Sequence, residues 1–185
     1  MSGRKSVGRA DTAAKAYTGQ RDIFADAFNF YLYGGRQVLH PEQLRELDST
    51  ELSYPFGADG RGEPVQKYRD VLKSAVFMEN GKAAYLLLGI ENQTSVHYAA
   101  PVKNLLYDAL QYARQVELTA KRHRESGDHK GHGGSEFLSG FYQEDKLFPV
   151  ITRILLFSPD EWDGPRTLRE MMETEESNIQ RTEKE

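Results

Sequence analysis

The chain has 185 residues, no cysteine and a formal net charge of −4. This length suits one domain with a substantial hydrophobic core rather than two full domains. The lack of cysteine excludes disulfides and thiolate zinc sites, and no apolar run approaches the ~20 residues that a membrane-spanning helix needs. The first residues lack the apolar core of a signal peptide, so we expect a cytoplasmic protein without membrane contact.

The negative charge is concentrated near the end of the chain. Residues 160–185 carry nine acidic and four basic side chains, which leaves the remainder with a net charge close to zero. Contacts with phosphate depend on local basic patches rather than on overall charge. The charge balance therefore neither supports nor excludes DNA as a partner.

The first third of the chain predicts one helix followed by irregular structure. Residues 1–11 are small, polar and basic, and their composition predicts disorder. Apolar residues recur at helical spacing over residues 14–33, and the two glycines at 34–35 end the pattern. A short helical turn is expected within residues 40–47, and the Gly-rich stretch 53–64 predicts a loop.

The strongest local pattern is a hairpin, in which YRDVLKSAVFM and AAYLLLGIENQ flank Asn80 and Gly81. Asn-Gly favours a type I′ turn, because both central residues of that turn have positive φ. In the simplest register Asp70 faces Glu91, and Gln93 shares their face. Carboxylates this close repel each other unless a positive charge lies between them, and a hard cation such as Mg²⁺ meets that need. The alternative is that Asp70 and Glu91 are solvated residues at the strand ends.

The segment after the hairpin turn predicts a strand and then a long helix. Residues 83–90 are apolar almost throughout, so we expect this strand to lie in the centre of its sheet. Pro101 opens a helix that continues to about Glu125. Six apolar residues at helical spacing form its expected buried stripe: Leu105, Leu106, Ala109, Leu110, Ala113 and Val116.

The last third predicts a loop, a strand and a polar end. Residues 126–140 are rich in glycine and histidine and predict a mobile loop. A second buried strand is expected over residues 150–157, and the strand–helix–strand order predicts a right-handed crossover with parallel pairing. A charged helix is expected from Pro165, followed by a charged tail over residues 173–185. The whole pattern predicts an α/β sandwich with the acids at one edge of a mixed sheet.

Several stretches resemble a known family. The segments YRDVLK, YLLLGIENQT, HYAAPVKNLLYDALQYARQVE, EFLSGFYQEDKLFPVIT and FSPDEWDGPRTLREMM are similar to the recombination-promoting nuclease and putative transposase family of the PD-(D/E)XK nuclease superfamily. The resemblance spans residues 22–172. It implies a nuclease-like domain over residues 12–172, with a mixed central sheet, a hairpin, a crossover helix and helices on both faces. It also implies a C-terminal tail that is shorter than in the family.

The resemblance implies a DNA endonuclease that depends on Mg²⁺ or Mn²⁺ and needs no small-molecule cofactor. Asp70 and Glu91 would bind the metal, and the backbone carbonyl of Asn92 could complete its coordination. Gln93 stands where the superfamily usually has lysine. Because an amide does not titrate near neutral pH, Gln93 would orient the water or a phosphate oxygen by hydrogen bonding. The expected roles are in recombination or in mobile-element and phage conflict, and a homodimer is left open.

Four other charged residues each have two interpretations. Asp26 could bring a third acid to the site or be a solvated helix residue. Lys103 could contact a phosphate or replace the missing lysine in part, although a plain surface lysine is the favoured alternative. Arg69 and Lys73 flank Asp70 and could bind DNA phosphates, but such residues also discourage aggregation at strand edges.

Two further alternatives concern the protein as a whole. His123, His129 and His132 with Asp128 would allow a zinc site, but their Gly-rich setting favours a mobile loop. The rival to a nuclease is a catalytically silent nucleic-acid-binding or interaction domain. Such a domain would keep the fold and would have lost activity through glutamine at position 93 or through the shortened end.

Overall fold

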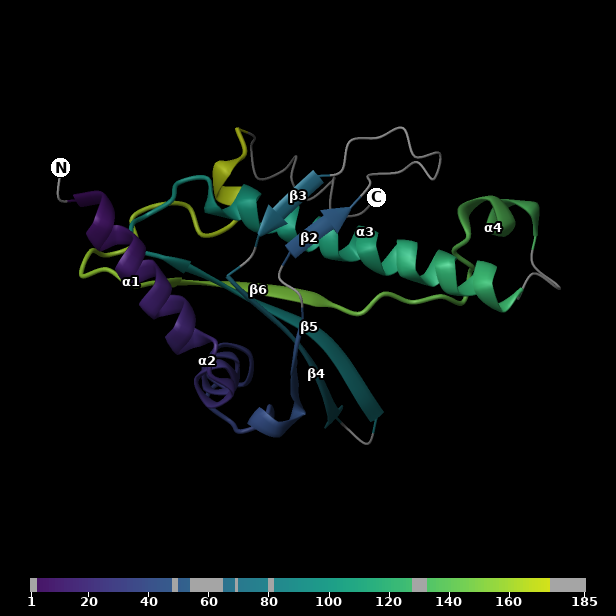
Figure 1. The fold of residues 1–185 in the computed structure, drawn as a ribbon, viewed down its shortest axis with the longest axis horizontal. Helices are drawn as coiled ribbons and strands as arrows, with labels where there is room; N and C mark the ends of the chain where they lie inside the picture. The colour runs from purple at the N-terminus through teal and green to yellow at the C-terminus, as the bar shows by residue number, and fades with distance from the viewer. Residues whose placement is uncertain are drawn as a thin grey trace.

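The computed structural model describes residues 3–47, 50–53, 65–68, 70–79, 82–127 and 133–173. In these residues a four-stranded sheet lies between helices, and a separate two-stranded sheet lies beside the long helix (Figure 1). The elements in chain order are α1 (Gly3–Thr18), α2 (Arg21–Tyr33), η1 (Pro41–Gln43), β1 (Leu44–Glu46), β2 (Thr50–Ser53), β3 (Val65–Tyr68), β4 (Val71–Glu79), β5 (Lys82–Gln93), α3 (Ala100–Ser126), α4 (Gly134–Ser139), β6 (Val150–Leu156) and η2 (Arg169–Met171).

The four-stranded sheet has the order β1-β4-β5-β6. Strands β4 and β5 are antiparallel, and their register pairs Val71 with Ile90 and Glu79 with Lys82, as the predicted hairpin requires. The turn residues 80–81 lie outside the described part of the chain. Strand β6 is parallel to β5, as expected for two strands joined through α3. The prediction of a mixed α/β sheet with a central β5 is therefore confirmed.

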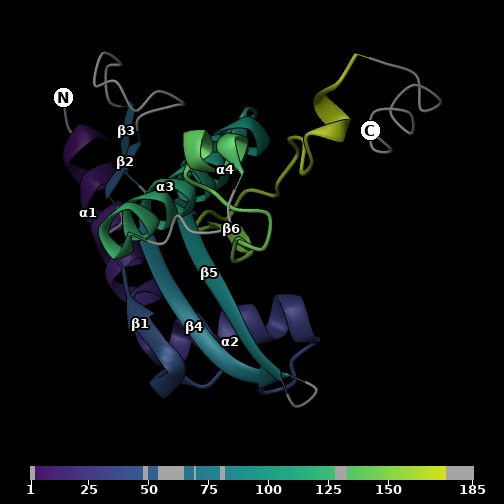
Figure 2. The same cartoon turned by 90° about the vertical axis from the view of Figure 1, so that its right-hand side faces the viewer.

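The helices cover opposite faces of this sheet. Successive residues of a strand point to opposite faces, and the side chain of Asn92 contacts Thr18 of α1 whereas that of Glu91 contacts Lys103 of α3. Figure 2 shows α3 and α2 on opposite sides of β4 and β5. Between α2 and the sheet lies the hydrophobic core, whose buried residues are Phe24, Ala25, Phe28, Leu39, Leu44, Val71, Ala75, Leu88 and Ile90.

The N-terminal region differs from the expectation. Helix α1 begins at Gly3, within the stretch 1–11 for which composition predicts disorder, and the single helix expected over residues 14–33 is two helices. The break lies at Gly19 and Gln20, where Gln20 is extended with φ −64° and ψ 135°. The carbonyl that Gly19 exposes at the end of α1 accepts a hydrogen bond of 2.8 Å from the ammonium of Lys73. This long-range contact stabilises the break.

Helix α3 has nearly the predicted bounds but a different buried face. Tyr107, Leu110 and Gln111 are buried, whereas Leu105 and Leu106 are 52% and 39% exposed. Residues three, four and seven positions apart share one helix face. The ion pair between Lys103 and Glu91 turns the Lys103 face to the sheet, and this turns the predicted apolar stripe partly to the outside.

The remaining differences are short elements. Residues 40–47 form the turn η1 and then strand β1 instead of a helical turn alone, and α4 lies inside the expected loop 126–140. Of the helix expected from Pro165, the described residues up to 173 form only the turn η2, and the Glu170 carboxylate accepts the N–H of Arg166 at 2.9 Å. In the part of the chain that the structure describes, no helix combines the length and apolar composition that crossing a bilayer requires.

Candidate functional site

The hairpin register brings Asp70 and Glu91 together. Asp70 directly precedes β4, and the last described pair of the ladder joins Val71 to Ile90. Continuing this register by one residue places Asp70 opposite Glu91. The Asp70 carboxylate contacts the residue after Glu91, since it accepts a 2.8 Å hydrogen bond from the backbone N–H of Asn92. The described register and this contact agree with the predicted facing of the two acids.

Both acids lie on the sheet face that α3 covers. Leu72 of β4 and Leu87 of β5 line a pocket against α3, and side chains two residues apart in a strand share a face. Asp70 therefore shares the face of Leu72, and Glu91 shares the face of Leu87. Gln93 lies at the end of β5 on this same face, and its carbonyl accepts the N–H of the first residue after β6 at 2.7 Å. The strand ends thus bring Asp70, Glu91 and Gln93 to one edge.

Glu91 is a buried carboxylate with one unpaired oxygen. Its residue is only 5% exposed, and Oε1 accepts a hydrogen bond from the ammonium of Lys103. Its second oxygen, Oε2, makes no hydrogen bond within the described structure. Burial raises the pKa of Glu91 and the nearby charge of Asp70 adds to this effect, although Lys103 and, less strongly, a backbone hydrogen bond from Asp70 oppose it. A buried oxygen without a partner is costly, so this atom is open to a cation or to a donor.

Asn92 connects the site to the N-terminal helix. Its side-chain amide donates to the hydroxyl of Thr18 at 3.0 Å, and Thr18 in turn donates to the carbonyl of Ala14 at 3.0 Å. Both Thr18 and Asn92 are buried. Helix α1 therefore fixes Asn92, whose backbone N–H holds the Asp70 carboxylate. Sequence reasoning did not identify Thr18, because no local pattern marks a contact between residues 74 positions apart.

The backbone of Asn92 is directed towards Asp70. The carbonyl of Gln93 accepts the N–H of Phe157 from the β6 side, and successive residues in a strand direct their peptide groups to opposite neighbours. The peptide groups of Asn92 therefore face the β4 side, as its N–H bond to Asp70 shows. This arrangement agrees with the expectation that the Asn92 carbonyl could be a further ligand.

Two of the other predicted residues, Lys73 and Asp26, lie away from Asp70 and Glu91. Lys73 is fully buried on the opposite face, where it contacts Gly19 and forms an ion pair with Glu46. A side chain in this position cannot reach a DNA phosphate, so the structure corrects that expectation: Lys73 is a structural cation that pairs with Glu46 and with the carbonyl of Gly19. Asp26 is exposed on α2, and no described contact joins it to Asp70. Arg69 lies outside the described residues.

His123, one of the residues considered for a zinc site, contacts Tyr142 and Asp145 instead. His123 is buried, its ring is stacked on that of Tyr142 at 3.9 Å, and its Nε2 lies 2.9 Å from a carboxylate oxygen of Asp145. Residues 128–132, which hold the other expected zinc ligands, lie outside the described part of the chain. Across the described residues, no three histidine, cysteine or acidic side chains cluster in a geometry that could hold a metal ion.

The candidate metal site therefore has two acids rather than three or more. Its donor set is nevertheless suited to a hard divalent cation: Asp70 and Glu91 are carboxylates, and the Asn92 carbonyl faces the same side. Mg²⁺ takes one or two carboxylates and retains several waters. The unpaired Oε2 of Glu91 fits this assignment, whereas Lys103 competes for the other oxygen of the same carboxylate.

Comparison with known proteins gives no relative. No family model matches the chain, and no match is found among curated proteins or solved structures.

Proposed function

We propose that this protein is a metal-dependent DNA endonuclease with little sequence specificity. The observation that carries the proposal is the convergence of Asp70 and Glu91 at one edge of the sheet, together with the unpaired buried oxygen of Glu91. Groups with shifted pKa values gather at functional sites, and structural ion pairs shift pKa values too, so the unpaired oxygen is the more specific of the two signs. The resemblance of residues 22–172 to the PD-(D/E)XK nucleases supports the same function.

The residues of the site have distinct proposed roles. Asp70 and Glu91 would hold Mg²⁺ or Mn²⁺, with the Asn92 carbonyl as a further ligand. A bound divalent ion supplies an activated water and stabilises negative charge on the phosphoryl and leaving oxygens. Gln93 would hold the water or a phosphate oxygen in line by hydrogen bonding, since its amide cannot accept a proton at neutral pH.

Lys103 has two roles in this proposal. Without metal, its ammonium neutralises the buried charge of Glu91. Its side chain is 31% exposed, so it can turn towards solvent or a DNA phosphate when a cation takes over Glu91. Lys103 would in this way supply from α3 the positive charge that the superfamily usually has on the strand, at the position of Gln93.

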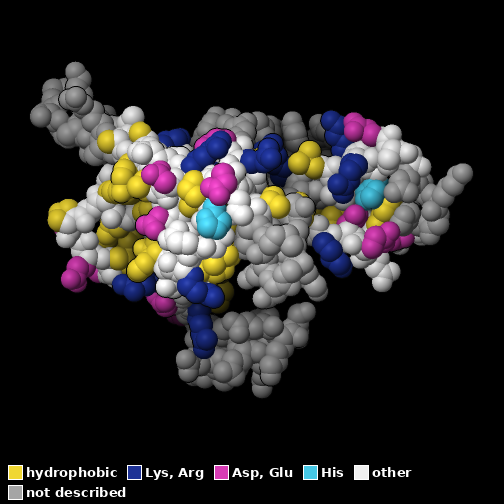
Figure 3. Space-filling view, turned by 90° about the horizontal axis from the view of Figure 1, so that it is seen from below, with side chains coloured by type: hydrophobic (Ala, Val, Ile, Leu, Met, Phe, Trp, Pro, Cys, Tyr) yellow, Lys and Arg dark blue, Asp and Glu magenta, His cyan; other side chains and the backbone are white. Residues whose placement is uncertain are grey.

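One observation favours the second function, a catalytically silent DNA-binding domain. The ion pair between Lys103 and Glu91 already satisfies one carboxylate oxygen, as it would in a site that had lost its metal. On the α2 side of the molecule, which Figure 3 shows and which is opposite to the two acids, acidic and basic side chains are intermixed. Both functions place DNA at the same edge of the sheet.

A nicking assay separates the two functions. Supercoiled plasmid is incubated with the protein and Mg²⁺ or Mn²⁺, with and without EDTA. We expect nicking that requires metal and is lost in Asp70→Ala. Glu125→Gln is the matched control, because Glu125 is an exposed acid at the far end of α3. Binding to DNA without cleavage under either metal would reject the nuclease and support the binding domain.

We also propose, from the sequence, that the protein acts in the cytoplasm in recombination or in conflict between mobile elements. A homodimer stays a prediction.

A further inference from the structure

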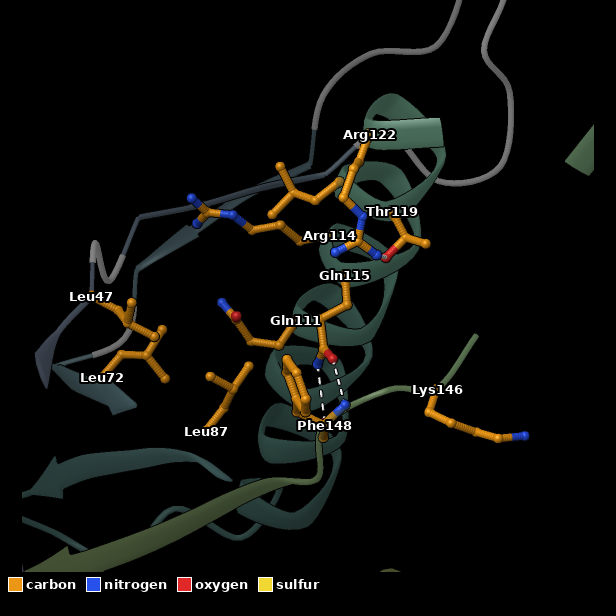
Figure 4. A pocket seen from close by; sticks show the side chains of 11 residues that line it. Leu47, Leu72, Leu87, Gln111, Arg114, Gln115, Thr119, Arg122, Lys146 and Phe148 are labelled. Carbon is orange, nitrogen blue, oxygen red and sulfur yellow. Dashed lines mark hydrogen bonds between the residues drawn. The ribbon is translucent and has the colours of Figure 1, made fainter. Parts of the chain in front are cut away.

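A pocket lies on the same sheet face as the two acids. It has a volume of about 360 Å³ and separates the C-terminal half of α3 from β4 and β5 (Figure 4). Pockets that hold small molecules start at roughly 300 Å³. The sheet side of this pocket is apolar, with Leu47, Leu72 and Leu87, whereas α3 provides Gln111 and Arg114. The pocket therefore combines an apolar wall with a polar one.

Gln111 is the first sign that the pocket accepts a ligand. The residue is 3% exposed, and its amide nitrogen makes no hydrogen bond anywhere in the described structure. An unpaired buried donor lowers the stability of the fold by about 1–3 kcal/mol, so a functional explanation for this one is worth seeking. Figure 4 shows that the side chain extends from α3 across the pocket, towards the side of Leu47 and Leu72. The side chain therefore lies at the wall of the pocket, and its covered, unpaired nitrogen is the donor that an acceptor atom of a ligand would satisfy.

Arg114 supplies a positive charge close to this amide. It follows Gln111 by three residues, and Figure 4 shows both side chains extending in the same direction. The ion pairs that the described residues form do not include Arg114. Arg122, by contrast, donates to Thr119 at 3.5 Å. Lys146 also lines the pocket, but Figure 4 shows its side chain pointing away from Gln111, so Arg114 is the cation placed beside the amide.

The position of the pocket relates it to the acid site. Leu72 is two residues beyond Asp70 and shares its sheet face, so the two side chains are roughly 7 Å apart along the strand. The pocket therefore begins beside the acid site on the same sheet face and extends away from it, because Arg114 lies eleven residues beyond Lys103 on α3, roughly 16 Å along the helix.

We propose that the pocket binds one unpaired nucleotide. Its base would lie against the leucine wall and accept a hydrogen bond from Gln111, and its phosphate would contact Arg114. A nucleotide provides a flat apolar body, an acceptor and a negative charge in one molecule, which are the three features that this pocket selects. The source is either an unpaired position in a DNA strand or a free nucleotide. The first source rests on the proposed nuclease function.

Binding is measured by calorimetry in EDTA, so that no cleavage occurs. The probes are dTMP, dAMP and inorganic phosphate. We expect the nucleotides to bind more tightly than phosphate, and Gln111→Leu and Arg114→Gln each to weaken nucleotide binding by about tenfold. Lys121→Gln is the matched control, because Lys121 is an exposed cation on α3 that does not line the pocket. This variant should bind as the wild type does.

A folding control accompanies the binding assay. Gln111→Leu removes a buried amide donor that has no partner, so its thermal midpoint should equal or exceed that of the wild type. The loss of nucleotide binding in a fully folded Gln111→Leu therefore reports on the pocket. Unchanged binding in this variant, or phosphate binding as tight as nucleotide binding, would overturn the proposal.

Competition identifies the source of the nucleotide. Displacement of dTMP by a single-stranded oligonucleotide but not by a duplex assigns the pocket to an unpaired position in DNA, whereas displacement by neither assigns it to a free nucleotide. The pocket and the nuclease function fail independently. Nucleotide binding without metal-dependent nicking would reject only the nuclease, and nicking without nucleotide binding would reject only the pocket.

Discussion

At the residue scale, substitution of Glu91 tests whether its contact with Lys103 belongs to a functional site or is only a structural ion pair. A buried carboxylate with an unpaired oxygen is unfavourable for folding, and Lys103 can reach water if it loses its partner. We therefore expect Glu91→Gln to leave the thermal midpoint unchanged or higher in EDTA and to weaken Mg²⁺ binding by at least tenfold. Differential scanning calorimetry and titration calorimetry measure the two effects. A strongly destabilised Glu91→Gln with normal Mg²⁺ binding would show that the pair with Lys103 serves stability alone.

Lys103 permits a second test at this scale, because it competes with a cation for Glu91. Replacing it by methionine keeps the length of the side chain and removes the charge. Lys103→Met should bind Mg²⁺ more tightly than the wild type, by several-fold, and should cleave DNA more slowly if Lys103 also contacts a phosphate. Lys121→Met is the control for lost charge on α3. Weaker Mg²⁺ binding in Lys103→Met would contradict the competition.

At the element scale, the contact between α1 and β5 depends on Thr18. Thr18→Val keeps the shape and removes the acceptor of the Asn92 amide, so it leaves a buried amide without a partner. The free energy of unfolding should fall by about 1–3 kcal/mol, as measured by urea denaturation. Thr18→Ser keeps the hydroxyl and should be affected less. Equal stabilities of Thr18→Val and the wild type would show that this contact does not anchor the helix.

The end of α3 provides a pH-dependent element. Burial alone would raise the pKa of Asp145, but the N–H of Tyr142 together with His123 and Arg122 lowers it below its ordinary value. A carboxyl with a lowered pKa in the folded state stabilises the fold above its unfolded pKa, and this contribution is lost as the pH falls through the folded value. Asp145→Asn should therefore be less stable than the wild type at pH 7, and the difference should shrink below about pH 4. Urea midpoints at the two pH values measure it. A difference that grows on acidification would contradict the assignment.

At the scale of the whole molecule, local patterns predicted the sheet better than the helices. The Asn-Gly hairpin fixed its own register over residues 71–90, and the strand–helix–strand order predicted the parallel pairing of β5 and β6. The break at Gly19 was not predictable, because it depends on Lys73, which is 54 residues away. The predicted buried face of α3 was also wrong, since the helix packs with Tyr107, Leu110 and Gln111 buried.

The candidate site shows the same division between local and long-range information. Asp70 and Glu91 could be predicted because hairpin register is a local property. The burial of Lys73 could not be predicted, because lysine is almost never fully buried unless its charge is paired. Its partner, Glu46, lies on another strand. Gln111 carried one weak signal, a polar residue beside the apolar Leu110 on the long helix. Only the packing of α3 shows that its amide is buried and unpaired.

The central claim is that a divalent metal binds between Asp70 and Glu91, and metal-directed cleavage of the protein backbone tests it most directly. Fe²⁺ replaces Mg²⁺ and reduces added hydrogen peroxide to hydroxide and a hydroxyl radical at the bound ion, ascorbate returns the resulting Fe³⁺ to Fe²⁺, and mass spectrometry locates the cuts. The account predicts cuts near residues 70 and 91–93, which excess Mg²⁺ suppresses and which are absent in Asp70→Ala. Cuts that lie elsewhere, or that persist in Asp70→Ala, would contradict it.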